Sequence, residues 1–514
     1  MKNAILLTFA SALASFAACG GANTPEPTIP PLEDIDDEVV QTDTTPEKQP
    51  PPESGPARDI AFPPIQRATL DNGLELNTVE WNQLPVVYLR LVIKSGAETD
   101  PEELQGLSNL VAQMLEEGTR RRNSAQLAEH IEFLGADLWT QADEENVHLV
   151  FRALSEHLDE AMSVLAEVAT QPAFRQDELT KLKRRENDRL ALMSKRPNFL
   201  ASRAFYRELY GDHPYGRVDT TPEVVQRVRR TDLLRWHRQH FVPANAFLVA
   251  VGDVTPAQVR EAAESAFGAW RGTAPSVTEP EPPSRREARE IVVVDRPGAV
   301  QSVILLGNLG IERRHDDYVD FLVANQVLGG SAASRLFMDL RERRSLTYGA
   351  YSSVSERVRI APFIAWAAVR TEVTGEAVDA FFENLNRIVT EPAPANELRD
   401  AQRYLSDSFP LQIDTPGKIA AMVADLRVFG LADDYWDGFR TSIGQVTPDE
   451  ALAAARRHIR PDKMLVLVVG EAAAVVEPLR QWGPVRVLDE NGEVKERFEA
   501  APPAARSAAA AGQE

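Results

Sequence analysis

The side chains best suited to chemistry in this sequence are one cysteine and eight histidines. Because Cys19 is the only cysteine, neither an intramolecular disulfide nor a thiolate metal cluster can form. His237 and His240 are three residues apart and could present two imidazoles on one face of a helix. No acidic third ligand lies close to them in sequence, so we expect them to end a helix before Pro243. The sequence also contains no G-x-S-x-G nucleophile elbow. We therefore predict that this chain binds no metal and carries no nucleophile of its own.

The single cysteine stands where an N-terminal apolar run ends. The run over residues 4–18 follows a basic start and is too short to span a bilayer, as is typical of a secretory signal peptide. The position of Cys19 resembles the lipobox of bacterial lipoproteins, although Phe16 stands where that motif usually has an aliphatic residue. We predict a signal peptide over residues 1–18 and a lipid anchor on Cys19, with a plain secreted protein as the alternative. By the same resemblance, Gly20 implies an outer-membrane anchor that faces the periplasm.

The composition limits the class of protein. The 514 residues suit two to four domains, and the 43% hydrophobic and 26% charged residues are ordinary for a globular protein. The net charge of −21 argues against nucleic acid as a partner, because binding phosphates needs a basic face.

Two proline-rich stretches divide the chain. Residues 19–58 hold nine prolines and nine acidic residues, which predicts an extended tether that cannot bury a core. A second proline-rich and charged stretch, residues 273–289, predicts a linker between domains over residues 59–272 and 290–490. Residues 491–514 are expected to form a flexible tail.

The two predicted domains repeat one pattern. Residues 247–254 read FLVAVGDV and residues 465–472 read LVLVVGEA, and each is a buried strand that leads into glycine and an acidic residue. Near the start of each domain another strand, at residues 86–92 or 303–306, precedes a long helical pattern. A repeat this long indicates a duplicated domain. We predict an α+β fold of two homologous domains, each a mainly antiparallel sheet with helices packed on one face.

Several segments in a fixed order resemble the pitrilysin/insulinase metallopeptidases. The first is an apolar-striped helix predicted over residues 106–119, GLSNLVAQMLEEGT. The others are NGL at residues 72–74, HPYG at 213–216, HFVPAN at 240–245, LGGSAASRLF at 328–337 and LRERRSLTY at 340–348. The resemblance covers about residues 62–490. It implies two domains that enclose half of a clamshell chamber for unfolded peptides.

Active members of that family carry H-x-x-E-H on the first helix. Two histidines one turn apart bind Zn²⁺, and the glutamate takes a proton from the zinc-bound water. Here the three positions hold Asn109, Ala112 and Gln113, and the third-ligand position matches Met193, with Glu186 as the nearest carboxylate. Asparagine and glutamine are weak zinc ligands, and alanine cannot act as a base. We predict that this chain hydrolyses no peptide by itself.

The second domain keeps the residues that the resemblance links to substrate. In the family, an arginine and a tyrosine seven residues apart reach the zinc site and stabilise the oxyanion. Arg341 and Tyr348 match them. Without the resemblance, Arg341 would belong to a solvated charged run and Tyr348 would be an ordinary strand residue.

These two sets of residues suggest a division of labour between chains, because some bacterial family members work as two-chain enzymes. We predict the non-catalytic subunit of a heterodimeric zinc endopeptidase, whose zinc-bearing homologous partner supplies Zn²⁺ and the base. The substrate would be a peptide or an unfolded protein. The alternative is a catalytically inert scaffold or peptide-binding module of the envelope.

Overall fold

The structure, a computed structural model, describes residue 55 and residues 60–276 and 279–501. The predicted signal peptide, Cys19 and nearly all of the tether lie outside the described residues, as does the end of the tail. Within the described part of the chain, no helix is both long and apolar enough to cross a membrane.

The first half contains a six-stranded sheet with the order β1-β2-β6-β3-β5-β4. Its strands are β1 (Gln66–Thr69), β2 (Glu75–Glu80), β3 (Val86–Ile93), β4 (Asp137–Ala142), β5 (Val147–Leu154) and β6 (Ala246–Gly252). Only the β2–β6 pair is parallel. Every residue of β6 is buried, because this central strand is covered on both faces.

Helices of the first half pack against one face of that sheet. They are α1 (Leu107–Leu115), α2 (Ser124–Phe133), α3 (Leu158–Thr170), α4 (Gln176–Met193), α5 (Pro197–Tyr210), α6 (Pro222–Arg227), α7 (Arg230–His240) and α8 (Pro256–Phe267). Apolar residues of α1, α3, α7 and α8 form one core with alternate residues of the strands. α5 is the exception, as described below.

The second half contains a seven-stranded sheet with the order β13-β12-β7-β11-β8-β10-β9. Its strands are β7 (Glu290–Asp295), β8 (Gln301–Leu309), β9 (Thr347–Val354), β10 (Pro362–Arg370), β11 (Leu465–Gly470), β12 (Val485–Leu488) and β13 (Val494–Phe498). β7 pairs in parallel with β11 and β12, and the other pairs are antiparallel. The predicted α+β class with two mainly antiparallel sheets is confirmed.

Helices α9, α11, α15 and α16 share a core with one face of the second sheet. The helices of this half are α9 (Tyr318–Leu328), α10 (Arg335–Phe337), α11 (Thr374–Thr390), α12 (Ala395–Ser408), α13 (Pro416–Val428), α14 (Tyr435–Gln445), α15 (Pro448–His458) and α16 (Ala472–Leu479). A π-helical turn, η6 (Met338–Arg343), directly follows α10.

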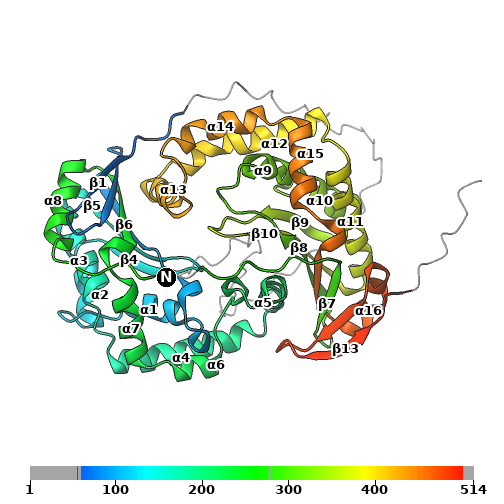
Figure 1. Cartoon of the computed structure of the whole chain (residues 1–514), viewed down its shortest axis with the longest axis horizontal. Coiled ribbons are helices and arrows are strands. Elements are labelled where there is room, and N and C mark those ends of the chain that lie inside the picture. The colour runs from blue at the N-terminus through cyan, green and yellow to red at the C-terminus, as the bar shows by residue number, and fades with distance from the viewer. Residues whose placement is uncertain (1–54, 56–59, 277–278, 502–514) are drawn as a thin grey trace, which may run out of the picture. The chain divides into compact units, whose positions relative to one another are not determined.

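The opposite face of each sheet is covered by a helix from the other half (Figure 1). α5 of the first half packs residues such as Phe205 against the second sheet, where Leu467 lies in the same core. α13 of the second half packs Val423 against Val249 of the first sheet. The sequence predicted helices on one face of each sheet, and the structure has a helix from the other half on the opposite face as well. Each half therefore contributes to the core of the other.

The HPYG turn joins the two halves through Tyr215. The Tyr215 hydroxyl donates a hydrogen bond to Glu145, which also accepts one from the Val358 amide at 2.7 Å. The Arg357 guanidinium lies 4.6 Å from the centre of the Tyr215 ring and binds Glu144 at 2.7 Å. Burial raises the pKa of the Glu145 carboxyl to about 7. This motif therefore has a structural role at the joint between the halves.

Candidate functional site

Helix α1 carries the three positions of the zinc motif. Asn109 and Gln113 are half-buried and lie one turn apart, while Ala112 is buried. Neither amide side chain forms a hydrogen bond with any residue that the structure describes. Two amides and a methyl group provide neither a strong zinc ligand nor a general base. The donor set on α1 therefore does not fit the family's zinc ion.

The third-ligand region on α4 does not fit it either. Met193, the last residue of α4, is half-buried and offers only a thioether. Glu186 is buried, but Arg189 binds it at 2.6 Å and also binds Asp219 at 2.8 Å. The backbone oxygen of Asp219 accepts a hydrogen bond from Gln105, two residues before α1, so this network lies beside the start of α1. Glu186 is already paired with a guanidinium, whose charge would repel a metal ion.

The N-terminus of α1 is nonetheless held firmly. Buried Asp100 accepts hydrogen bonds from the amides of Gly106 and Ser108, both at 2.8 Å, and from the Ser108 hydroxyl at 3.1 Å. Gly106 has a φ of +87°, a conformation that glycine adopts without strain. Burial raises the pKa of Asp100 to about 7, although these hydrogen bonds oppose the shift. Asp100 thus satisfies amides that a helix start leaves unpaired.

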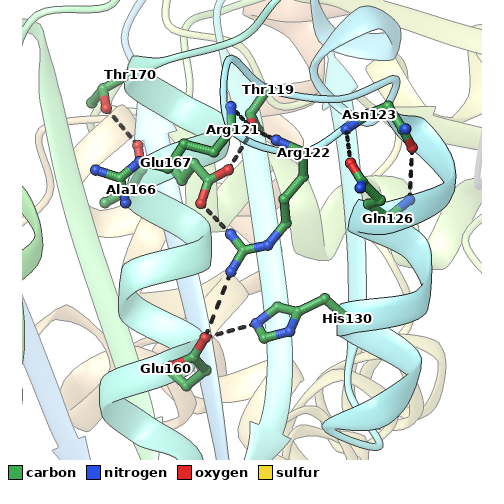
Figure 2. A network of polar contacts seen from close by, with 10 residues as sticks. All are labelled: Thr119, Arg121, Arg122, Asn123, Gln126, His130, Glu160, Ala166, Glu167 and Thr170. Carbon is green, nitrogen blue, oxygen red and sulfur yellow. Dashed lines mark hydrogen bonds and ion pairs between the residues drawn. The ribbon is translucent and has the colours of Figure 1, made fainter.

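The segment that follows α1 is anchored to α3 (Figure 2). Buried Glu167 of α3 accepts hydrogen bonds from the Thr119 hydroxyl and from the Arg122 guanidinium. Arg122 also approaches Glu160 at 4.0 Å, and Glu160 binds His130 of α2 at 2.7 Å. α1 is therefore positioned from both ends by polar contacts that involve none of its motif residues.

In the second half, Arg341 and Tyr348 lie on either side of one short turn. Arg341 belongs to η6, and its guanidinium lies 4.8 Å from the centre of the Phe337 ring. Its side chain is 46% exposed and has one ion pair, with exposed Glu342 at 3.4 Å. Tyr348 is the second residue of the edge strand β9 and is 91% exposed. Its hydroxyl makes no hydrogen bond to the residues that the structure describes.

The turn between them has a fixed backbone. The amide of Leu346 donates to the carbonyl of Leu340 at 2.8 Å, and the amide of Ser345 donates to that of Arg341 at 3.1 Å. Ser345 has a φ of +55°, which is uncommon for a residue other than glycine. The side chains of Leu340 and Leu346 are buried, so packing holds this sharp turn in place.

Arg341 differs from its neighbours in the charged run. Buried Asp339 binds Arg343 at 2.6 Å and Arg344 at 2.8 Å, and it also accepts a hydrogen bond from Asn384. Arg341 has no contact with this carboxylate. The run is therefore not a uniform solvated face, because two of its arginines pair with buried Asp339, whereas Arg341 pairs only with exposed Glu342 and packs against the Phe337 ring.

The histidines singled out in the sequence do not form a metal site. α7 ends at His240, as predicted. His237 pairs with the carbonyl of Ala169 at 2.8 Å, whereas His240 pairs with the hydroxyl of Ser95 at 2.9 Å. Burial lowers the pKa of both imidazoles to about 4.

Sequence reasoning did miss one group, His315, Asp317 and His458, because its members are far apart in the chain.

Two family descriptions match the two halves of the chain. "Insulinase (Peptidase family M16)" matches residues 78–222, and "Peptidase M16 inactive domain" matches residues 227–405. Among curated proteins, "Uncharacterized zinc protease YmxG" of Bacillus subtilis is 23% identical over 354 residues, which cover 68% of this chain and 85% of that protein. "Non-peptidase homolog YmxG" of Helicobacter pylori is 25% identical over 338 residues, with 65% and 77% covered. The chain is thus similar both to named zinc proteases and to a named non-peptidase.

Solved structures share the fold. The crystal structure of a peptidase M16 inactive domain from Pseudomonas fluorescens aligns with a TM-score of 0.75 and 26% identity, covering 79% of this chain and 97% of that chain. A protease from Helicobacter pylori aligns with a TM-score of 0.73 and 17% identity, covering 79% and 99%. The two-domain arrangement is therefore that of these relatives.

Proposed function

Because the chain belongs to the insulinase family of metallopeptidases, we propose that it is the non-catalytic subunit of a two-chain zinc endopeptidase. Its partner is a homologous chain that carries H-x-x-E-H and binds the zinc ion. This chain contributes Arg341 and Tyr348 to the shared site. The substrate is a peptide or an unfolded protein, and Cys19 tethers the complex to the outer membrane on its periplasmic side.

Two observations together carry this proposal: α1 lacks the zinc ligands, and Arg341 and Tyr348 are exposed with few contacts in this chain. α1 keeps its supports but has none of the zinc ligands, whereas Arg341 and Tyr348 stand exposed on a rigid turn. An exposed tyrosine whose hydroxyl has no partner among the described residues contributes little to this fold. A guanidinium and a phenol hydroxyl are both hydrogen-bond donors, which suits groups that meet a substrate on another chain.

The chemistry assigned to the pair is binding and charge stabilisation. Zinc on the partner supplies an activated water for attack on the peptide carbonyl. The positively charged Arg341 guanidinium holds a substrate carbonyl oxygen. The Tyr348 hydroxyl donates a hydrogen bond to the oxygen on which negative charge develops. The fixed turn presents both donors without reorganisation.

The first test is a mixing experiment. The full chain and its nearest zinc-motif homologue from the same genome are purified separately, and cleavage of a quenched fluorescent peptide is measured for each and for the mixture. We expect efficient cleavage by the mixture and not by either chain on its own. We also expect the two chains to elute together in size-exclusion chromatography. Cleavage by this chain alone would contradict the proposal. A silent mixture would instead favour the inert scaffold or peptide-binding module.

A further inference from the structure

Three metal-ligating side chains meet in the second half, on elements that carry none of the proposed active-site residues. His315 and Asp317 lie in the loop between β8 and α9, and His458 is the last residue of α15. One ligand atom from each lies within 4.8 Å of the other two. Among the described residues, one group of histidine, cysteine and carboxylate side chains has a spacing that suits a metal ion, and it is this one.

Packing and backbone hydrogen bonds hold His458 in place. It is buried, and its ring centroid lies 5.3 Å from that of Phe321. The Asn308 side chain donates to the His458 carbonyl at 2.8 Å and accepts from the Arg460 amide at 3.0 Å, so the backbone is fixed on both sides. An unprotonated imidazole nitrogen has a lone pair for a metal ion.

His315 and Asp317 are the less buried members of the group. Nδ1 of His315 accepts a hydrogen bond from the Asp317 amide at 3.0 Å, and the His315 side chain is exposed. Oδ2 of Asp317 contacts Nε2 of His458 at 2.6 Å and Nε of Arg457 at 2.7 Å.

We propose that His315, Asp317 and His458 bind a divalent cation of the Zn²⁺ type, with water completing a tetrahedral site. Two imidazoles and one carboxylate are a ligand set that zinc accepts in proteins. Zinc–ligand bonds place neighbouring ligand atoms about 3.3 Å apart. The observed separations, from 2.6 Å to no more than 4.8 Å, lie on both sides of that value, so small side-chain movements suffice.

The cation replaces contacts that now join the same side chains. It takes the place of the hydrogen bond between His458 and Asp317, and it displaces Arg457 from the carboxylate. The Arg457 side chain is 53% exposed and can move into solvent. The ion then links the start of α9 to the end of α15, which already pack together. This site departs from the sequence-based expectation of no metal, and it is independent of any zinc on a partner chain.

The test is a Zn²⁺ titration by calorimetry of the full chain, produced without a histidine tag and stripped with chelator. We expect one ion per chain and a rise in Tm on binding. His315→Ala and Asp317→Asn should each weaken binding by more than about 100-fold, since even outer-shell changes cost 10–100-fold. Arg457→Gln should tighten binding severalfold, because it removes a competing cation. His157→Ala, at a histidine in the first half, is the matched control and should bind as the native chain does.

Several outcomes would overturn the proposal. One is the absence of saturable Zn²⁺ binding to the native chain. Another is binding that His315→Ala and Asp317→Asn leave unchanged, which would place the ion elsewhere. Circular dichroism establishes that each variant folds. If either His315→Ala or Asp317→Asn does not fold, the other variant and Arg457→Gln still decide the matter, because a purely structural ion pair would not give their opposite shifts.

Discussion

Helix α1 and the turn from η6 to β9 hold the positions that we match to two parts of the family's peptidase site, and they differ in what their side chains contact. The motif residues Asn109 and Gln113 make no hydrogen bond within the described chain, while Asp100 and Glu167 hold α1 from both ends. On the turn the backbone is equally fixed, but Tyr348 is exposed to solvent.

In both regions, the residues that hold the backbone in place differ from Asn109, Gln113, Arg341 and Tyr348, the polar residues that we match to the family's site. Because Asn109 and Gln113 make no hydrogen bond within the described chain, exchanging them costs the fold little, whereas Ala112 is buried in the core. Arg341 and Tyr348 likewise stabilise little within the chain, since surface ion pairs and exposed rings contribute weakly. The role that we propose for them involves another molecule. The following predictions test this contrast.

Apart from the loss of Arg341, the largest expected effect belongs to Tyr348→Phe. This change removes the hydroxyl and keeps the ring, so kcat of the mixture with the zinc-bearing homologue should fall about 100-fold through loss of one oxyanion donor. Tyr404→Phe, at an exposed tyrosine on α12, is the control and should leave kcat unchanged. An unchanged kcat for Tyr348→Phe would remove the tyrosine from the shared site.

The support of α1 is tested by Glu167→Ala. The substitution leaves Thr119 and Arg122 without their acceptor, and the free energy of unfolding should fall by about 2 kcal/mol. Urea denaturation measures this change. Glu132→Ala, at an exposed glutamate of α2, should stay within about 0.5 kcal/mol of the native value. Equal stability of the two variants would contradict the anchoring role of Glu167.

The joint between the halves should depend on pH through Glu145. Its pKa is raised to about 7 in the folded chain, against about 4.3 for an ordinary glutamate. Its stabilisation is complete below the unfolded pKa and is lost as the pH rises through about 7. Relative to Glu145→Gln, the native chain should lose about 2 kcal/mol of stability between pH 5 and pH 8. A stability difference that stays constant across these pH values would refute the buried proton.

The smallest effect is expected from Asn109→Ala combined with Gln113→Ala. Neither amide has a partner among the described residues, so the variant should unfold within about 0.5 kcal/mol of the native chain. Peptide cleavage by the mixture should change by less than about twofold. A large loss of cleavage would mean that α1 of this chain still contacts substrate.

The strands and the duplication could be predicted because buried strands carry continuous apolar runs. The segments predicted over residues 247–254 and 465–472 are β6 and β11, and the helix predicted over residues 106–119 is α1. The exchange of α5 and α13 could not be predicted. An amphipathic pattern identifies the apolar face of a helix, but not which sheet that face covers.

The candidate site was predictable only in part. The residue types at Asn109, Ala112 and Gln113 already exclude the zinc chemistry. The pairing of Arg343 and Arg344 with Asp339, which sets Arg341 apart, depends on the shape of η6. A search for local motifs also cannot relate His315 to His458, because these residues are far apart in sequence. The packing of α15 on α9 brings them together.

The most direct measurement of the central claim is kcat of the mixed complex with Arg341→Ala in this chain. Arg343→Ala is the matched control, since it removes an exposed arginine from the same turn while Asp339 keeps Arg344 and Asn384 as partners. The account predicts a fall of about 100-fold or more for Arg341→Ala and a native rate for Arg343→Ala. Native rates for both variants would contradict the shared site.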